Sequence, residues 1–139
     1  MAIQSAQSEL ESPKRVFRRR HRLPSGVYAQ VFEAKLRKSR GPITVHLRVN
    51  EVGEHRLGLS IGRKFGNAVK RGRFKRMMRE VFRLNRTELS IPGEGCGYDI
   101  VVTARGHEQA SLEAYTGWVL EAIEAAHRVH VRRSERSDV

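Results

Sequence analysis

The residues whose type and spacing most clearly suit a binding function are ten cations between positions 63 and 86. The only acid in that stretch is Glu80, so it carries a net charge of +9 out of +12 for all 139 residues. At roughly 100° per residue, five of the cations fall on about one third of a helix: Lys75, Arg76, Arg79, Arg83 and Arg86. A solvated face usually mixes both signs, because like charges at i,i+4 repel. The pattern therefore predicts a cationic ridge that binds nucleic-acid phosphates.

The helix that must carry this ridge is expected over residues 67–86. Its apolar side chains gather opposite the cations, which lets one face pack while the ridge faces solvent: Phe74, Met77, Met78, Val81 and Leu84. Arginine outnumbers lysine here, which favours bidentate phosphate contacts and stacking on bases.

Two aromatic side chains upstream could stack on unpaired bases. Tyr28 and Phe32 lie one turn apart in a helix predicted over residues 25–36, with Ser25 as its N-cap. Ordinary core packing is the alternative role for both rings. His46 and Arg48 alternate with apolar residues of a predicted strand, so both point to one face and could line the same cleft. For His46 alone a structural role is the simpler interpretation.

Other chemistries find little support. The six histidines are scattered, no two carboxylates pair at a definable site, and Asp99 opens a predicted strand, where it is interpreted as a turn or cap residue. Cys96 is the only cysteine, which excludes an intramolecular disulfide and a cysteine-based zinc site. No apolar run approaches the roughly 20 residues that span a bilayer, and the N-terminus lacks the apolar centre of a signal peptide. We therefore expect a cytoplasmic protein that does not contact membranes.

The expected element order is helix, two strands, helix, strand, helix. This order predicts an α+β sandwich, with three helices packed on a small mixed sheet of the four-stranded type. Residues 1–13 are expected to form a disordered tail, residues 14–130 a single RNA-binding domain, and residues 131–139 a polar, frayed tail. The strand over residues 57–61 has almost no side-chain bulk on its Gly58 and Ser60 face. Either a helix or a nucleic-acid strand could pack there.

Several motifs follow one another from Arg56 to Arg86, and this run resembles the protein component of bacterial ribonuclease P. The matching segments are Gly58-Leu59-Ser60-Ile61, Arg63-Lys64, Gly66-Asn67-Ala68-Val69 and the R-x-R-x-K-R-x-x-R pattern over residues 71–79. Residues 22–32 and 98–102 extend the resemblance. Two positions depart from the family pattern. Gly72 replaces an asparagine, and Val27-Tyr28 replaces an aspartate-phenylalanine pair.

The resemblance implies the protein subunit of an endoribonuclease whose catalytic centre lies in an RNA subunit. That complex removes the 5′ leader of precursor tRNA, with magnesium held mainly by the RNA, and needs no obligate protein partner. A left-handed crossover between parallel strands is also implied. The residues expected to contact the RNA subunit are Arg63, Lys64, Asn67, Lys70, Arg71, Arg73, Lys75, Arg76 and Arg79. Those expected to contact the leader are Tyr28, Phe32, His46, Arg48 and Ser60.

Two other classes of protein would also carry such a large positive charge. A structural RNA-binding protein, such as a ribosomal protein, would need no aromatic leader cleft. A basic DNA-architectural protein is less consistent with the mixed order of strands and helices and with the absence of a dimer-forming heptad.

Overall fold

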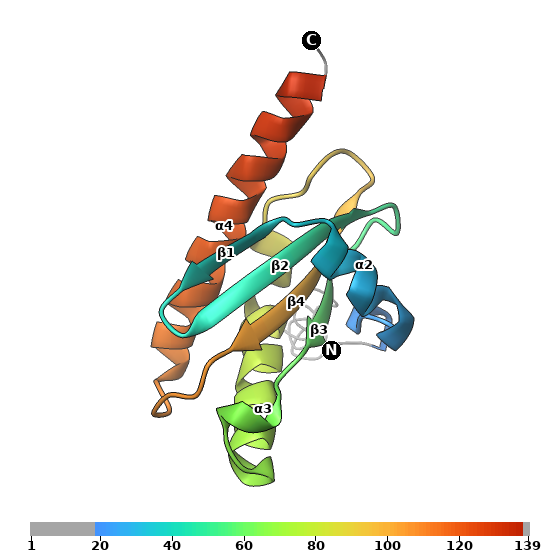
Figure 1. Ribbon diagram of the computed structural model, residues 1–139. Helices are drawn as coiled ribbons and strands as arrows, with labels where there is room; N and C mark the ends of the chain where they lie inside the picture. The colour runs from blue at the N-terminus through green and yellow to red at the C-terminus, as the bar shows by residue number, and fades with distance from the viewer. Residues whose placement is uncertain (1–18, 138–139) are drawn as a thin grey trace, which may run out of the picture.

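The computed structural model describes residues 19–137, and it has one four-stranded sheet (Figure 1). The strands are β1 (Arg37–Arg40), β2 (Ile43–Asn50), β3 (Arg56–Leu59) and β4 (Gly97–Ala104), and the helices are α2 (Tyr28–Glu33), α3 (Ala68–Asn85) and α4 (Leu112–Ser137). Short 3-10 turns occur at Arg19–His21, Ser25–Val27, Arg63–Phe65 and Arg86–Glu88. The expected sandwich of a small mixed sheet and three helices is confirmed. None of the helices within residues 19–137 is long and apolar enough to cross a membrane.

The sheet has the order β1-β2-β4-β3. β2 pairs antiparallel with β1 and β4, whereas β3 pairs parallel with β4, with Leu57 opposite Ile100. The connection from β3 through α3 to β4 runs behind the sheet in Figure 1 and forms the left-handed crossover that the resemblance implied.

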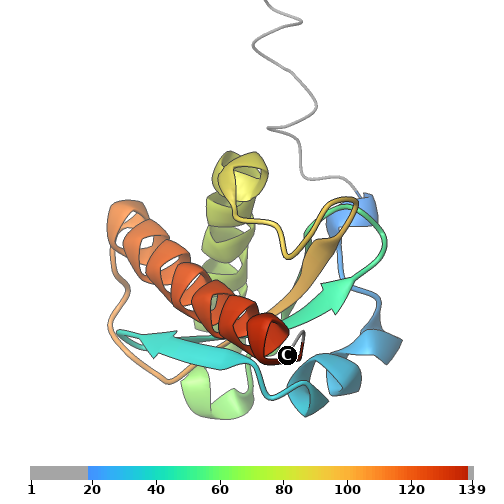
Figure 2. The same cartoon turned by 90° about the horizontal axis from the view of Figure 1, so that it is seen from above.

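Helices cover the two faces of the sheet unequally, as Figure 2 shows: α3 and α4 lie on one side and α2 on the other. The large core joins α3, α4 and the alternating residues of β2 and β4, including Ile43, Val45, Ile100 and Val102. On the opposite face a small cluster joins Val31 of α2 to Leu23 and to Val101 of β4. This second face therefore stays partly open, and it carries the candidate site.

The helix predicted over residues 25–36 is much shorter in the structure. Ser25 makes no side-chain cap, and α2 ends at Glu33, since Lys35 has a left-handed φ of 51°. The chain then forms β1, which the sequence analysis missed, and turns through Gly41 into β2. A Cβ at Gly41 would lie 2.6 Å from the Trp118 ring, so this turn packs tightly against α4.

The C-terminal helix is longer than expected. α4 continues to Ser137, so the prediction of a frayed tail from residue 131 is wrong for residues 131–137. Arg133 explains part of this extension, because its guanidinium donates hydrogen bonds to the carbonyls of Ala34 (3.4 Å) and Lys35 (2.9 Å) at the end of α2. The predicted tail over residues 1–13 lies outside the described residues.

Candidate nucleic-acid interface

The helix that carries the cations begins at a defined cap. Asn67 precedes α3, and its side-chain oxygen accepts the backbone N–H of Lys70 at 2.9 Å. Four buried side chains hold the helix on the sheet: Phe74, Met78, Val81 and Phe82. The predicted helix over residues 67–86 is confirmed to within one residue. Leu84, which was expected on the apolar face, is 38% exposed.

The cationic ridge is narrower than the sequence predicted. Arg86 lies past the end of α3 and is buried, so it does not belong to a solvent-facing ridge. Arg83 donates a hydrogen bond to Glu80 at 3.0 Å, which means that an acid does compensate this cation. Lys75, Arg76 and Arg79 remain partly or fully exposed and form the ridge in the structure.

The remaining predicted RNA-subunit contacts lie at the start of α3. Arg63 and Lys64 are exposed in the 3-10 turn before it. Lys70 and Arg73 are also exposed, whereas Arg71 folds back and donates to the Gly66 carbonyl at 3.2 Å. The structure therefore groups these cations at one end of α3, with the ridge following along the helix.

Tyr28 ties α2 to the open edge of the sheet. Its hydroxyl accepts the backbone N–H of Leu59 at 3.0 Å, and a Cβ added to Gly58 would lie 2.6 Å from its ring. The bare glycine face of β3 is thus covered by a helix at Gly58, while Ser60 stays exposed. This packing gives Tyr28 a structural role in addition to the predicted stacking role.

A groove of about 150 Å³ joins the two predicted contact sets. Tyr28 and Leu59 line one side of it, and Lys75 and Arg79 of α3 line the other. Arg22 adds a further cation. A polyanion in this groove would meet an aromatic ring and three positive side chains together.

Phe32 and His46 form the second part of the open face. Their ring centroids are 4.8 Å apart in an edge-to-face contact, and Phe32 is 39% exposed. Together with Lys35 and Arg37 they line a shallow hollow of about 460 Å³. Burial and then the Arg37 cation lower the pKa of the His46 imidazole, which favours its neutral form. The hollow therefore offers an exposed ring between two cations.

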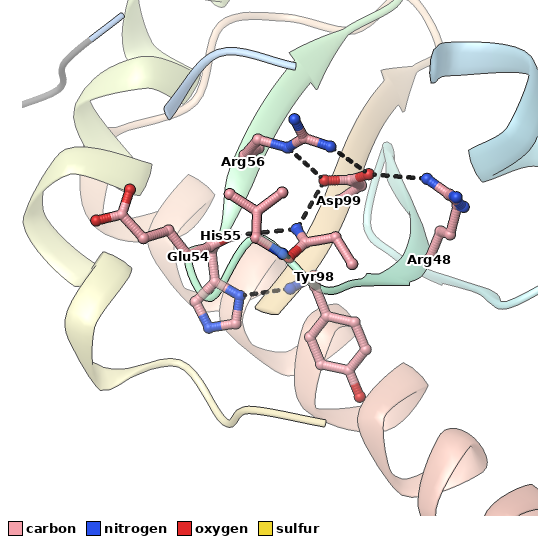
Figure 3. A network of polar contacts seen from close by, with 8 residues as sticks. Arg48, Glu54, His55, Arg56, Tyr98 and Asp99 are labelled. Carbon is pink, nitrogen blue, oxygen red and sulfur yellow. Dashed lines mark hydrogen bonds and ion pairs between the residues drawn. The ribbon is translucent and has the colours of Figure 1, made fainter. Parts of the chain in front are cut away.

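Arg48 is held by a buried network that the sequence analysis did not find (Figure 3). Asp99 is fully buried within β4, so its interpretation as a turn or cap residue is wrong. Its carboxylate accepts hydrogen bonds from Arg56 (2.8 and 2.9 Å), Asn50 (2.8 Å) and Arg48 (3.2 Å). Two guanidinium groups on one carboxylate leave a net positive charge beside the open face.

One signal in the sequence pointed to this network. Asp99 stands between apolar residues of a strand, and a buried carboxylate requires charged or hydrogen-bonding partners. The partners themselves come from β2 and β3, so their identity depends on the register of the sheet.

No group of three histidine, cysteine or acidic side chains suited to a metal ion occurs within residues 19–137. Cys96 is a free thiol, as predicted. The groove and the hollow on the open face are lined by cations and aromatic rings.

Comparison with known proteins identifies the family. A family model described as Ribonuclease P matches residues 17–132. The chain belongs to the ribonuclease P protein family. A ribonuclease P protein component of Methylococcus capsulatus is 43% identical over 91 residues, which cover 64% of this chain and 66% of that protein. One from Syntrophobacter fumaroxidans is 46% identical over 68 residues, covering 48% and 54% respectively.

Solved ribonuclease P proteins share the fold. The RNase P protein of Thermotoga maritima is 30% identical, with a TM-score of 0.59 over 72% of this chain and 92% of that one. A Staphylococcus aureus RNase P protein, at 23% identity, supports the fold alone, with a TM-score of 0.60 over 76% of this chain and 94% of that one. The first curated relatives are matched over only 50–63% of their own length.

Proposed function

We propose that this chain is the protein subunit of ribonuclease P. In this proposal α3 and the turn before it bind the catalytic RNA subunit, and the open face beside α2 binds the 5′ leader of precursor tRNA. Cleavage then gives the mature 5′ end of the tRNA. The observation that carries the proposal is the groove in which Tyr28 of the leader face meets Lys75 and Arg79 of the ridge.

The chain's own contribution is binding and orientation. Exposed cations neutralise RNA phosphates, and Phe32 offers a stacking surface for an unpaired base. Arg48 is pre-oriented by Asp99, which reduces the conformational entropy lost when it binds a phosphate. The proposal places the magnesium ions and the catalytic centre in the RNA subunit, as the family resemblance implies.

Reconstitution with a bacterial ribonuclease P RNA tests the proposal. The complex should cleave precursor tRNA faster than the RNA alone at low magnesium, and should bind precursor more tightly than mature tRNA. Equal affinity for both tRNAs, without any gain in cleavage, would favour a structural RNA-binding protein instead.

A charge-matched pair of variants locates the interface. Replacing Lys75 and Arg79 with alanine should lower affinity for the RNA subunit. The slope of log K, the association constant, against log salt concentration should become less steep by roughly 1.4 to 1.8 units. Replacing Arg132 and Arg136 removes the same charge from exposed positions of α4 and should leave that slope nearly unchanged. Equal effects of the two double variants would show that net charge alone governs binding.

A further inference from the structure

A second cavity lies on the other flank of α3, away from the groove that contains Tyr28. Its volume is about 270 Å³, and its walls come from the turn before α3, from α3 itself, from the loop after β4 and from α4. At roughly 100° per residue, Lys70 and Arg73 project from one flank of the helix and Lys75 and Arg79 from the other. An RNA lying across α3 can therefore contact both flanks.

Aromatic rings form the walls of this cavity. Phe65 and His107 are partly exposed and nearly perpendicular, with centroids 5.4 Å apart. Phe74 lies behind both rings, at 4.9 Å from Phe65 and 5.8 Å from His107. A cavity of about 150 Å³ accommodates benzene, so this one has room for a flat base.

The cavity is held open by a chain of hydrogen bonds. The His107 Nδ1 donates to the Arg105 carbonyl at 2.8 Å, and its Nε2 lies 2.7 Å from the Tyr115 hydroxyl. That hydroxyl also accepts the backbone N–H of Ala110 at 3.2 Å. These bonds fix the loop after β4 against α4, so an entering ring would need little reorganisation.

The mouth of the cavity carries the charges that a nucleotide requires. Lys70 and Arg73 line it together with one acid, Glu108. Arg73 donates a hydrogen bond to the Gln109 side chain at 3.0 Å, which orients an amide at the rim. Phosphate complements the two cations, and the amide can bond to a base edge.

We propose that this cavity binds one unpaired base of an RNA, stacked on one of the Phe65 and His107 rings with its edge against the other, and with its phosphate on Lys70 and Arg73. The identity of that RNA as the ribonuclease P RNA subunit rests on the proposed function, whereas the base-binding chemistry does not. An apolar side chain of a protein partner would fill the cavity without using the two cations, which favours a nucleotide as the occupant.

Titration of the free chain with mononucleotides tests this site independently of any RNA subunit. AMP should shift the backbone amide signals of Phe65, His107 and Gln109 with a millimolar Kd, while ribose 5-phosphate should shift mainly those of Lys70 and Arg73. If ribose 5-phosphate shifted the Phe65, His107 and Gln109 signals as much as AMP does, the site would bind only phosphate, and the proposal would be overturned. So would the absence of shifts with AMP, or larger shifts with N-acetylphenylalaninamide, which would indicate a protein partner.

Two variants of one residue separate stacking from folding. Phe65→Tyr keeps a ring and should retain AMP binding, whereas Phe65→Leu keeps an apolar side chain and should weaken it at least about fivefold. Thermal unfolding of both variants checks the fold. In the reconstituted complex, Phe65→Leu should lower RNA-subunit affinity by a similar factor and leave the preference for precursor over mature tRNA unchanged. A failed reconstitution would count against the proposed function, while the AMP titration would still decide the site.

Discussion

The phenolic oxygen of Tyr28 lies 3.0 Å from the backbone nitrogen of Leu59 and accepts its hydrogen bond. This contact joins α2 to the outer edge of β3, where no further strand pairs with Leu59 within the described sheet. The Tyr28 hydroxyl therefore adds a hydrogen bond at the β3 edge to the apolar contacts of Val31 that hold α2, and with it the leader face, on the sheet.

Tyr28→Phe removes the hydroxyl and keeps the ring. The Leu59 N–H then loses its acceptor, so the free energy of unfolding should fall by about 1 kcal/mol. Urea denaturation measures this loss. Because the ring remains, the affinity for precursor tRNA should change little under conditions in which the variant is fully folded. A large loss of precursor binding with no loss of stability would show that the hydroxyl contacts the RNA and does not stabilise the fold.

Phe32→Leu should act on the leader alone. Phe32 is 39% exposed and makes an edge-to-face contact with the His46 ring, so leucine keeps part of the packing and removes the stacking surface. Affinity for precursor tRNA should fall about 5-fold or more, as expected for one lost base stack, while mature tRNA binds unchanged. Filter binding of both tRNAs to the reconstituted complex measures the ratio. Equal losses for the two would indicate a damaged core.

Asp99→Asn should destabilise the fold strongly. Asparagine keeps the shape of the side chain but removes the charge that compensates Arg56, which is only 15% exposed. The expected loss is about 3 kcal/mol, as for breaking one side of a buried ion pair. Arg48→Gln is the matched control, because Arg48 is 36% exposed and should cost less. A larger loss in the Arg48 variant than in the Asp99 variant would contradict this account of the network.

The sequence predicted α3 well and the surroundings of Asp99 poorly, for physical reasons. The period of the apolar residues and the Asn67 cap are local signals, so α3 was placed to within one residue. β1 is an edge strand with polar side chains on both faces, Arg37–Arg40. Its sequence therefore shows no alternation of apolar and polar residues. Arg86 was assigned to the ridge by continuing the helical period beyond Asn85, where α3 ends.

Features built from distant segments could not be predicted in the same way. The partners of Asp99 come from β2 and β3, and the aromatic cavity joins Phe65, Phe74 and His107 from three segments. Their proximity follows from strand order and crossover hand. Periodicity within each element fixes which face a residue occupies, but not which residue of another element lies opposite.

Stability should fall as the pH drops from 7.5 to 5. Burial is the largest cause that lowers the pKa of His55. The contact with the Leu89 carbonyl opposes it, and the Arg86 and His127 charges lower that pKa further. Below about pH 6.5 the unfolded chain takes up a proton that the folded chain resists, so the free energy of unfolding falls, by at most about 1.4 kcal/mol per pH unit for one group. Thermal unfolding at constant ionic strength measures this slope.

His55→Gln provides the control for that slope. Its amide oxygen can accept the Tyr98 N–H that His55 Nδ1 accepts at 3.0 Å, and it does not titrate. The variant should therefore lose part of the dependence on pH. An unchanged slope would assign the effect to the other histidines with lowered pKa, His46 and His130.

Gly72 gives the sharpest test of how closely RNA approaches α3. The family pattern has an asparagine here. A glycine would cost little if the helix started near Gly72, but α3 begins at Ala68 and Gly72 is one turn inside it. A Cβ at Gly72 would contact only the Arg76 side chain, at 3.4 Å, and the backbone φ there is not positive. A side chain therefore fits the free protein, and the glycine costs helix stability.

Replacing this glycine should accordingly stabilise the fold in a defined order. Gly72→Ala should raise the free energy of unfolding by up to about 1 kcal/mol, and Gly72→Asn by a few tenths, following helix propensity. Both variants should support cleavage of precursor tRNA by the reconstituted complex, because the family pattern has an asparagine side chain at this position and a Cβ there contacts only Arg76. Urea denaturation and single-turnover cleavage measure the two effects. Suppose instead that both variants fold more stably and yet bind the RNA subunit tenfold more weakly. The RNA backbone must then lie against Gly72 itself, and the missing side chain would be a requirement of the interface.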